Sequence, residues 1–355
     1  MEKGRGTGVN PPNRFEQFHA EPFEIDVPYD DERPPVKTIF FDDASKTILA
    51  KNDSPDIPFT FSVNPYRGCE HGCVYCYARP SHEYLGFSAG LDFESRIMVK
   101  RQAPALLRHE LRAKRWIPQA VEMSGNTDCY QPVERVLQLT RGCLEVFLEL
   151  RNPVAIITKN YGVIRDLDLL TALAKLDLVR VTLSITTLDE SLARRMEPRT
   201  ATPQKRFEAV RILADAGVPT SVSIAPVVPG LTDEELPAIL RQASDHGADR
   251  VTYSLLRLPG AVENLFSNWI EEIAPDRAAK ILGRVREVHA GKLADSKFGR
   301  RMRGNGTIAE MIENLFSINA RKLGLPTAAK QLDAGKFVGR GSAQLGLFDD
   351  APPQS

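Results

Sequence analysis

Three of the five cysteines in this 355-residue chain, Cys69, Cys73 and Cys76, lie within eight positions. The surrounding sequence NPYRGCEHGCVYCYAR spaces them as C-x3-C-x2-C. A single loop with this spacing can present three thiolates to three irons of a cuboidal cluster, so that the fourth iron of a 4Fe–4S cluster stays open. Gly68 and Gly72 allow the backbone to bend close to such a cluster without a Cβ clash. These residues therefore predict an iron–sulfur site with one exchangeable iron.

A zinc loop is the alternative site for the same cysteines. Zinc sites normally close with four ligands, usually as two separated pairs. The nearest further ligands, His71 and His82, do not supply that spacing. A disulfide framework is disfavoured, because the cysteine count is odd and three of the five are crowded together. A non-catalytic zinc-binding adaptor remains the rival interpretation.

The elements that must position this loop alternate between strands and helices. From about Phe59 onward, apolar runs typical of strands are each followed by an amphipathic helical stretch. This pattern predicts right-handed β-α-β units and a parallel sheet. About six units fit before residue 260, too few for an eight-fold barrel, so we expect an α/β fold with a partial (β/α)6 TIM-like barrel and catalytic loops at the C-terminal ends of the strands. The expected strands cover 120–124, 154–158, 179–185, 220–226 and 250–256, and the expected helices cover 134–150, 167–176, 203–216 and 233–246.

The remaining segments differ from this core in composition. The first 35 residues are rich in Pro, Gly and charge and have almost no periodic apolar pattern. The run KTIFFDDASKTILAK contains two short β-like stretches around a polar turn. We expect a flexible N-terminal arm over 1–35, a short β hairpin or strap over 36–58, the barrel over 59–260, a helical C-terminal extension over 261–325 and a flexible tail over 326–355.

The overall charge does not single out a class of partner, because 46 basic residues balance 46 acidic residues. Hydrophobic residues make up 42% of the chain, enough for a sizeable core. No apolar run approaches the roughly 20 residues needed to cross a bilayer. The N-terminal sequence MEKGRGTGVNPPNRFEQF lacks the apolar stretch of a secretory signal. We expect a cytoplasmic protein with no membrane partner.

Five further fragments follow the cysteine loop in order. They are Val121–Glu134 (VEMSGNTDCYQPVE), Thr158–Asn160, Ser184–Thr187, Met196–Arg206 (MEPRTATPQKR) and Ala225–Gly230 (APVVPG). Together with the C-x3-C-x2-C loop after the first strand, they resemble the radical S-adenosylmethionine (SAM) superfamily. Within it, they resemble the group related to spore photoproduct lyase, the DNA repair photolyase-like proteins. The resemblance covers about residues 59–260, and the ordered set is more specific than any fragment alone.

The resemblance implies a radical SAM enzyme whose cofactors are a 4Fe–4S cluster and S-adenosyl-L-methionine. In that superfamily the open iron chelates the amino and carboxylate groups of SAM, and one electron from the reduced cluster cleaves the sulfonium. The resulting 5′-deoxyadenosyl radical abstracts hydrogen from a substrate. A one-electron reductant such as flavodoxin or ferredoxin is then an expected partner. The branch suggests a substrate linked to nucleic acid, with DNA as a partner, and a protein or small molecule is the alternative substrate.

The resemblance also implies a set of cofactor-binding residues. Ser124, Gly125 and Asn126 end the second strand, where the superfamily places a motif that receives the methionine amino group, and Thr127 and Asp128 add hydrogen-bonding oxygens. The other implied assignments are Lys159 to the cofactor carboxylate, Ser184 to its ribose or carboxylate, Tyr75 to adenine, Tyr77 to the substrate side, and Glu197 and Arg199 to the cofactor site.

Three of these assignments have structural alternatives. Asp128 could cap the helix that follows it. Lys159 at a strand end could be an ordinary solvated lysine. Glu197 and Arg199, with the proline between them, could form a structural ion pair and turn.

The chain departs from spore photoproduct lyases at their hydrogen-donor cysteine. Gly125 occupies the matching position, and Cys129 lies four residues further on, directly after Asp128. Cys129 is the candidate for a displaced thiol donor. The alternative is a small buried residue, because free cysteine is among the most buried residue types. Cys143 lies in a helical pattern and is assigned to the core.

The tail contains the run QLGLF at residues 344–348. It resembles the Gln-Leu-x-Leu-Phe motif by which bacterial polymerases and repair proteins bind the sliding clamp. Gln344, Leu345, Leu347 and Phe348 would then enter a preformed pocket on the clamp. The alternative is that the three apolar side chains fold back onto the barrel.

Two basic clusters give modest support to nucleic acid as a partner. They comprise Arg108, Arg112, Lys114 and Arg115, and the run from Lys297 to Arg303. Neither cluster is interleaved with many aromatic residues, so a solvated face is the alternative.

Overall fold

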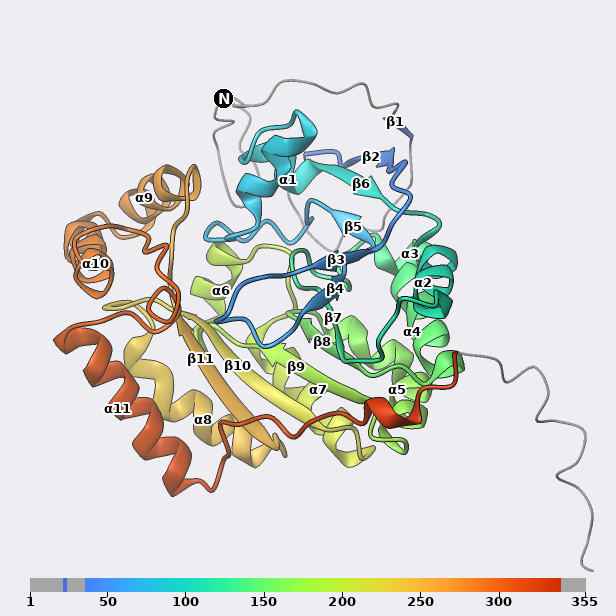
Figure 1. Ribbon diagram of the computed structural model, residues 1–355. Coiled ribbons are helices and arrows are strands. Elements are labelled where there is room, and N and C mark those ends of the chain that lie inside the picture. The colour runs from blue at the N-terminus through green and yellow to red at the C-terminus, as the bar shows by residue number, and fades with distance from the viewer. Residues whose placement is uncertain (1–21, 24–35, 340–355) are drawn as a thin grey trace, which may run out of the picture.

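The computed structural model describes residues 22–23 and 36–339. The expected N-terminal arm, apart from residues 22–23, and the motif at 344–348 therefore lie outside the described residues. The described chain forms a curved sheet covered by helices, with a smaller sheet beside it (Figure 1).

The main sheet is an open barrel. Its strand order is β11 (Arg250–Leu255), β10 (Thr220–Val227), β9 (Val179–Ser184), β8 (Val154–Thr158), β7 (Val121–Met123), β4 (Phe61–Val63) and β3 (Leu49–Lys51). The strands from β11 to β4 are parallel to their neighbours, and β3 is antiparallel to β4. The edge strands β3 and β11 do not pair with each other in the described part of the chain. The expected partial (β/α)6 barrel is therefore confirmed.

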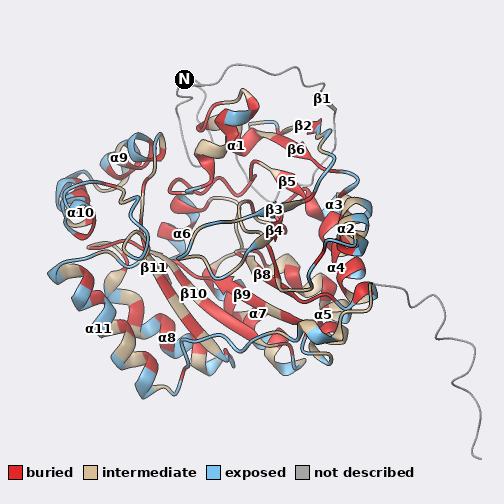
Figure 2. Ribbon diagram, viewed as in Figure 1, coloured by how far each residue is buried: buried red, intermediate tan, exposed pale blue. Residues whose placement is uncertain are grey.

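Helices connect the parallel strands and cover the outer face of the sheet, with buried stripes toward the strands (Figure 2). They are α4 (Leu139–Leu150), α5 (Leu167–Ala174), α7 (Pro203–Asp215) and α8 (Leu236–Asp245), with the 3-10 turns η2 (Tyr161–Asp166) and η3 (Asp233–Glu235). The short helix α6 (Glu190–Met196) packs instead against the loop that carries Cys73. Helix α7 shows the local signals well. The Thr202 side chain accepts a hydrogen bond from the Lys205 N–H, Pro203 begins the first turn, and Gly217 follows the helix with a φ of 75°.

The two faces of the main sheet differ in polarity. Val121 and Met123 of β7 are fully buried in the core under the helices. Side chains alternate along a strand, so Glu122 points to the inner face, where Ser62 is its register neighbour. Burial raises the pKa of Glu122 to about 8. A closed TIM barrel fills its interior with branched aliphatic side chains, whereas polar side chains line this stretch of the open inner face.

A second sheet contains β1 (Pro22–Phe23), β2 (Ile39–Asp42), β6 (Arg96–Val99) and β5 (Tyr66–Arg67), in that order. Of the two alternatives for 36–58, a hairpin or a strap, the hairpin is wrong, because β2 pairs with β1 and β6 whereas β3 pairs with β4. An isolated two-stranded hairpin is only marginally stable, and each strand buries more apolar surface by joining a larger sheet. The segment therefore runs from one sheet to the other.

Short helices complete the connections around the second sheet. They are η1 (Arg79–Leu85), α1 (Leu91–Ser95), α2 (Ala103–Arg112) and α3 (Glu134–Leu137). Helix α2 packs against α4 on the outside of the barrel. The stretch containing η1 and α1 lies directly after the cysteine loop, so it can support that loop.

The C-terminal region contains the helices α9 (Val262–Ile273), α10 (Pro275–Val288) and α11 (Thr307–Lys322), then the short turn η4 (Ala334–Lys336). After α11 the chain crosses the N-terminal ends of the strands as an extended segment, here called the strap (residues 326–338). Its bonds include the Val251 N–H to the Pro326 carbonyl (3.0 Å), Arg180 to the Lys330 carbonyl (2.8 Å) and the Val338 N–H to the Leu150 carbonyl (3.0 Å). Within residues 22–23 and 36–339, none of the helices combines the length and apolarity needed to cross a bilayer.

Candidate functional site

The three clustered cysteines lie in the loop after β4 and β5, at the C-terminal edge of the main sheet. Cys69 and Cys73 are buried, Cys76 is half-buried, and none of the three forms a disulfide. Gly68 and Gly72 adopt positive φ values of 81° and 67°. A Cβ on Gly68 would lie 2.9 Å from a backbone carbonyl oxygen, so this turn requires glycine.

The donor set fits a cluster with one open iron. Burial, followed by the nearby Glu197, raises the pKa of Cys73, and burial followed by Cys69 raises the pKa of Cys76. Such thiols ionise when a bound cation supplies the compensating charge. Across the described residues, no three His, Cys, Asp or Glu side chains are arranged around a single ion. A cuboidal cluster requires a wider arrangement, because each thiolate binds a different iron.

Arg79 braces the cysteine loop from inside the protein. Its side chain is 0% exposed. Its five N–H donors reach the carbonyl oxygens of Cys73 (3.0 Å), Gly72 (3.1 Å), Gly90 (2.8 Å) and Ala89 (3.2 Å) and the carboxylate of Glu94 (2.8 Å). Glu94 is itself buried, so the pair is a satisfied internal ion pair. Protein groups alone therefore hold the loop in shape.

Asp128 connects the cysteine loop to the ends of β7 and β8. His71 Nδ1 lies 3.4 Å from its Oδ2, and His71 Nε2 lies 3.1 Å from the Asn160 amide nitrogen. Asp128 also accepts hydrogen bonds from the Thr158 hydroxyl and the Lys159 N–H, both at 2.8 Å. Burial alone would raise the pKa of Asp128, but His71 and the backbone donors lower it to about 2. Asp128 is thus an ionised link between three loops.

Glu70 and Arg199 fasten the loop on its other side. Arg199 Nη1 donates to Glu70 Oε1 at 2.9 Å, and the Arg199 N–H donates to the His71 carbonyl at 3.3 Å. Glu70 also accepts from the Thr38 hydroxyl at 3.0 Å and from the Val133 N–H at 2.8 Å. Arg199 therefore acts on the loop that carries the cysteines.

Glu197 is the centre of a further buried network. It accepts hydrogen bonds from the Tyr75 hydroxyl, from Thr186 at 2.7 Å and from the Arg206 guanidinium. Burial would raise the pKa of Glu197, yet Arg206 keeps it below its ordinary value. The alternative of an ion pair between Glu197 and Arg199 does not hold, because Glu197 pairs with Arg206 and Arg199 pairs with Glu70. The network fixes the tyrosine that lies between the second and third cysteines.

Lys159 and Ser184 lie where β8 and β9 end. Lys159 is half-buried, and its Nζ lies 5.9 Å from the centroid of the Tyr75 ring. Ser184 is buried, and its carbonyl accepts from Arg206 at 2.9 Å. The ends of the neighbouring parallel strands β8 and β9 thus bring the Lys159 ammonium and Ser184 to the same edge of the sheet as the cysteines.

The chain turns sharply after β7, at Ser124 and Gly125. Ser124 has a φ of 74°, and its hydroxyl accepts from the Cys129 N–H at 2.8 Å. A Cβ on Gly125 would lie 2.8 Å from the Ser62 Cβ, so a larger residue would push the two strands apart. The glycine keeps the backbone of this turn close to β4.

Asn126 and Thr127 fix the same turn through internal hydrogen bonds. Asn64 Oδ1 accepts from the N–H groups of Asn126 (2.9 Å) and Thr127 (3.3 Å). The Asn126 amide donates to the Ser81 hydroxyl at 3.2 Å, and the Thr127 hydroxyl donates to the Tyr66 carbonyl at 2.7 Å. These side chains hold the turn against the cysteine loop and the second sheet.

Tyr77 and Arg257 form the open side of this edge. Tyr77 is 47% exposed, and its hydroxyl donates to the Gly125 carbonyl at 2.9 Å. Arg257 follows β11, and its guanidinium carbon lies 4.9 Å from the centroid of the Tyr77 ring. The ends of β4, β7 and β11 therefore meet at one exposed aromatic side chain.

Cys129 does not reach this edge. It is fully buried in the main core, and its thiol lies beside the hydroxyls of Ser124 and Thr140. This burial favours the alternative, a small buried residue, over a displaced thiol donor, because a donor must meet the substrate. Cys143 lies in the same core, as expected.

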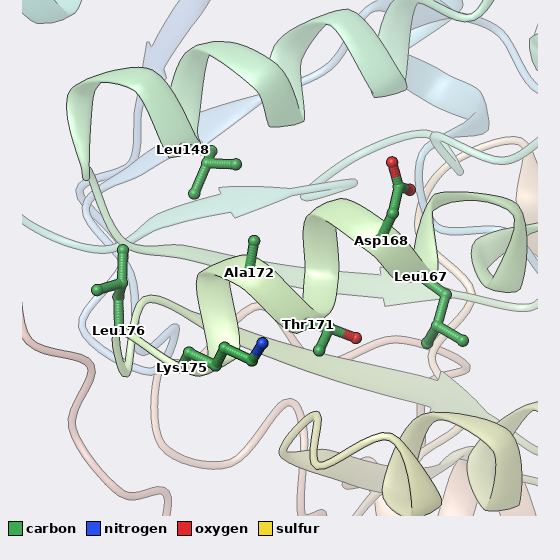
Figure 3. Close-up of a pocket in the computed structure, with 7 residues that line it drawn as sticks. All are labelled: Leu148, Leu167, Asp168, Thr171, Ala172, Lys175 and Leu176. Atoms are coloured by element: carbon green, nitrogen blue, oxygen red, sulfur yellow. The ribbon is translucent and has the colours of Figure 1, made fainter.

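A surface hollow of about 600 Å³ lies away from these residues. It is formed by α4 and α5 on the outer, helical face of the barrel (Figure 3). Leu148, Leu167 and Leu176 line it together with Asp168 and Lys175. It contains none of the predicted site residues.

Several residues that shape the site were not candidates in the sequence. They are Arg79, Glu70, Asn160, Arg206 and Arg257. A buried arginine and a surface arginine look alike in a sequence, so their roles depend on tertiary contacts. Glu70 and Arg79 carried a local signal, since Glu70 directly follows the first cysteine and Arg79 follows the third by three positions. Asn160 and Arg206 lie at the ends of two of the fragments quoted for the resemblance.

Known proteins resemble this chain in sequence. The profile of the Radical SAM superfamily matches residues 63–243, which is more than half of the chain. A protein of Mycobacterium tuberculosis, described as uncharacterized, is 38% identical over 235 residues, covering 66% of this chain and 68% of that protein. A protein of Methanocaldococcus jannaschii, also described as uncharacterized, is 30% identical over 175 residues, covering 49% of this chain and 63% of that protein.

Solved structures resemble the chain in fold. Spore photoproduct lyase complexed with dinucleoside spore photoproduct superposes with a TM-score of 0.56 at 15% identity, over 80% of this chain and 78% of that one. A variant of that lyase with bound AdoMet and dinucleoside spore photoproduct gives a TM-score of 0.54 at 16% identity, over 79% of this chain and 77% of that one.

Proposed function

Because the chain belongs to the radical SAM superfamily, an enzyme family that uses a 4Fe–4S cluster and SAM, we propose that Cys69, Cys73 and Cys76 hold the cluster. One observation carries this proposal. The three free thiols share one glycine-hinged loop at the C-terminal edge of a parallel sheet. That edge is where βα loops of barrel enzymes place their reacting groups.

Held at these cysteines, a 4Fe–4S cluster with SAM would supply radical chemistry that begins with hydrogen abstraction from the substrate. The residues of the chain keep the site in shape. Arg79 and Asp128 hold the cysteine loop, and Glu197 holds Tyr75. Burial of Cys69 and Cys73 keeps water away from this part of the site.

We assign the SAM-binding role to the turn Ser124–Thr127, to Lys159 and to Ser184. The absence of a side chain at Gly125 leaves its backbone open to close approach. The Lys159 ammonium can neutralise a carboxylate beside the Tyr75 ring. Asp128, Glu197 and Arg199 are assigned as positioning residues, because each is already paired within the protein.

For the substrate we propose a group linked to nucleic acid. Support comes from the likeness in fold to a lyase complexed with a dinucleoside spore photoproduct. Further support comes from the exposed aromatic residue and arginine at the site edge, which suit bases and phosphates. A one-electron reductant of the flavodoxin or ferredoxin type would reduce the cluster.

The test is anaerobic. The protein is reconstituted with iron and sulfide, reduced with dithionite and supplied with SAM, and 5′-deoxyadenosine is measured by chromatography. The variant with Cys69→Ala, Cys73→Ala and Cys76→Ala should lose the broad visible absorption of the cluster and the product. Cys143→Ala is the matched control, because that cysteine is buried away from the loop, and it should keep both.

A deuterated oligonucleotide then tests the substrate. Deuterium in the 5′-deoxyadenosine would support hydrogen abstraction from nucleic acid. If SAM is cleaved but no oligonucleotide transfers deuterium to the 5′-deoxyadenosine, the substrate is instead a peptide or a small molecule. A colourless protein that retains zinc would overturn the proposed chemistry altogether.

A further inference from the structure

The position of Arg257 is fixed by its backbone neighbours. The Leu256 N–H donates to the Val227 carbonyl at 2.9 Å, and the Leu258 N–H donates to the Leu293 carbonyl at 3.1 Å. Leu256 and Leu258 are both buried. The half-buried side chain between them is therefore held at the end of β11 rather than swinging freely.

The guanidinium of Arg257 has no oxygen acceptor among residues 36–339. It contacts the face of the Tyr77 ring at 4.9 Å and lies within electrostatic reach of the Cys76 thiol. Burial lowers the pKa of Arg257. A partly desolvated cation without an acceptor is unfavourable, and an anion supplied from outside would relieve that cost.

Arg301 provides a contrast in the same neighbourhood. It forms two hydrogen bonds with Asp56, at 2.8 and 2.6 Å, and a third with the Ser54 hydroxyl. The connection between β3 and β4 reaches toward the end of β11 in Figure 1, and this ion pair joins it to the C-terminal region. Asp56 is thus hydrogen-bonded to Arg301, and it acts on Arg257 only at a distance, through its charge.

Two arginine–aromatic pairs lie near the C-terminal end of β11. Arg257 lies over Tyr77 and Arg301 lies over Phe298, at 4.9 and 5.0 Å. The two rings are 47% and 57% exposed. Exposed rings beside guanidinium groups suit the stacked bases and phosphates of a single strand, whereas a peptide carboxylate would leave the rings unused. We call Tyr77, Arg257, Phe298 and Arg301 the rim.

We infer that Arg257 binds a phosphate of a single-stranded nucleic acid substrate and so sets its position at the rim, beside the Cys76 side of the cluster loop. This inference rests on the proposed function and gives it a substrate class. Arg257 is a substrate-binding residue in this scheme, and SAM is held by the residues assigned above.

The experiment compares binding of a fluorescent single-stranded thymidine dodecamer by the reconstituted holoprotein and its variants. Arg257→Gln should weaken binding about 10- to 100-fold, the loss expected for one charged hydrogen-bonded contact. It should also lower the slope of log affinity against log salt by about 0.7. Arg286→Gln removes a charge from an exposed position on α10 and should change affinity less than about twofold. Arg257→Lys should recover part of the loss.

SAM cleavage without nucleic acid separates the outcomes. The matched variant Arg286→Gln should keep the cluster absorption and this basal cleavage. Unchanged dodecamer binding by Arg257→Gln, or equal losses in Arg257→Gln and Arg286→Gln, would overturn the inference. Loss of basal SAM cleavage by Arg257→Gln with dodecamer binding retained would assign Arg257 to the cofactor and overturn it as well. A wild-type protein that cleaves no SAM defeats the proposed function, while the binding comparison still tests Arg257.

Discussion

The two sides of the site differ in how fully their polar groups are paired. On the cysteine-loop side, Arg79 uses all five of its donors, and Asp128 accepts from several groups at once. On the rim, Tyr77 is exposed and Arg257 has no acceptor within residues 36–339. A site that must hold a fixed cofactor benefits from a prebuilt framework. A site that must accept and release a substrate leaves groups for the ligand to satisfy.

The largest effect is expected from replacing Arg79, which holds the cysteine loop on the fully paired side of the site. Arg79→Met should lower the free energy of unfolding by about 3–5 kcal/mol, because it removes the cationic partner of the buried Glu94 carboxylate. Chemical denaturation measures this change, and iron content after reconstitution should fall with it. Arg96→Met is the control, because its ion pair with Asp92 is partly exposed and should contribute less than about 1 kcal/mol. Similar losses in the two variants would show that Arg79 is not a special support.

A pair of tyrosines gives a matched test with one hydroxyl on each side. Tyr75→Phe should cost about 1–3 kcal/mol, because the buried Glu197 network loses a donor. Tyr77→Phe should change stability by less than about 0.5 kcal/mol, because its hydroxyl lies at the surface. Urea unfolding of both variants provides the comparison. An equal cost would contradict the division between a rigid side and an open side.

The smallest expected effect concerns the ion pair between Asp56 and the rim residue Arg301. Arg301 lowers the pKa of Asp56 from 3.8 to about 2. A carboxyl whose pKa is lower in the folded state stabilises the protein above about pH 4, and that stability is lost as the pH falls toward 2. Asp56→Asn should therefore lose about 1 kcal/mol at pH 7 and show a flatter acid limb in unfolding experiments.

Asp53→Asn is the control for that prediction. Asp53 lies with Asp56 in the connection between β3 and β4, and its side chain is 84% exposed. The stability of Asp53→Asn at acid pH should therefore follow that of the wild type. A flattened limb in both variants would mean that general charge, and not the Asp56–Arg301 pair, sets the acid response.

The sequence predicted the barrel because its signals are local. Strand and helix periods, the Thr202 cap and the C-x3-C-x2-C spacing can all be read within short windows. The hairpin failed because strand pairing depends on partners elsewhere, and β2 and β3 found them in different sheets. Burial of Cys129 and of Arg79 is likewise a tertiary property. The cysteines and some of their supports, such as Asp128 and Glu197, could be found from the chain alone, but the partners of those supports could not.

The strap has a consequence for the order of folding. Its contacts span great distances along the chain, since Arg180 bonds Lys330 and Lys336 bonds the Leu176 carbonyl, 150 and 160 residues away. The βα units form from local contacts and can fold early as they leave the ribosome, whereas contacts of such high sequence separation form late. The N-terminal ends of the strands therefore stay uncovered until residues 326–338 have been synthesised. During that interval the backbone N–H of Val251, which bonds the Pro326 carbonyl in the folded chain, lacks that acceptor and is available to pair with another chain.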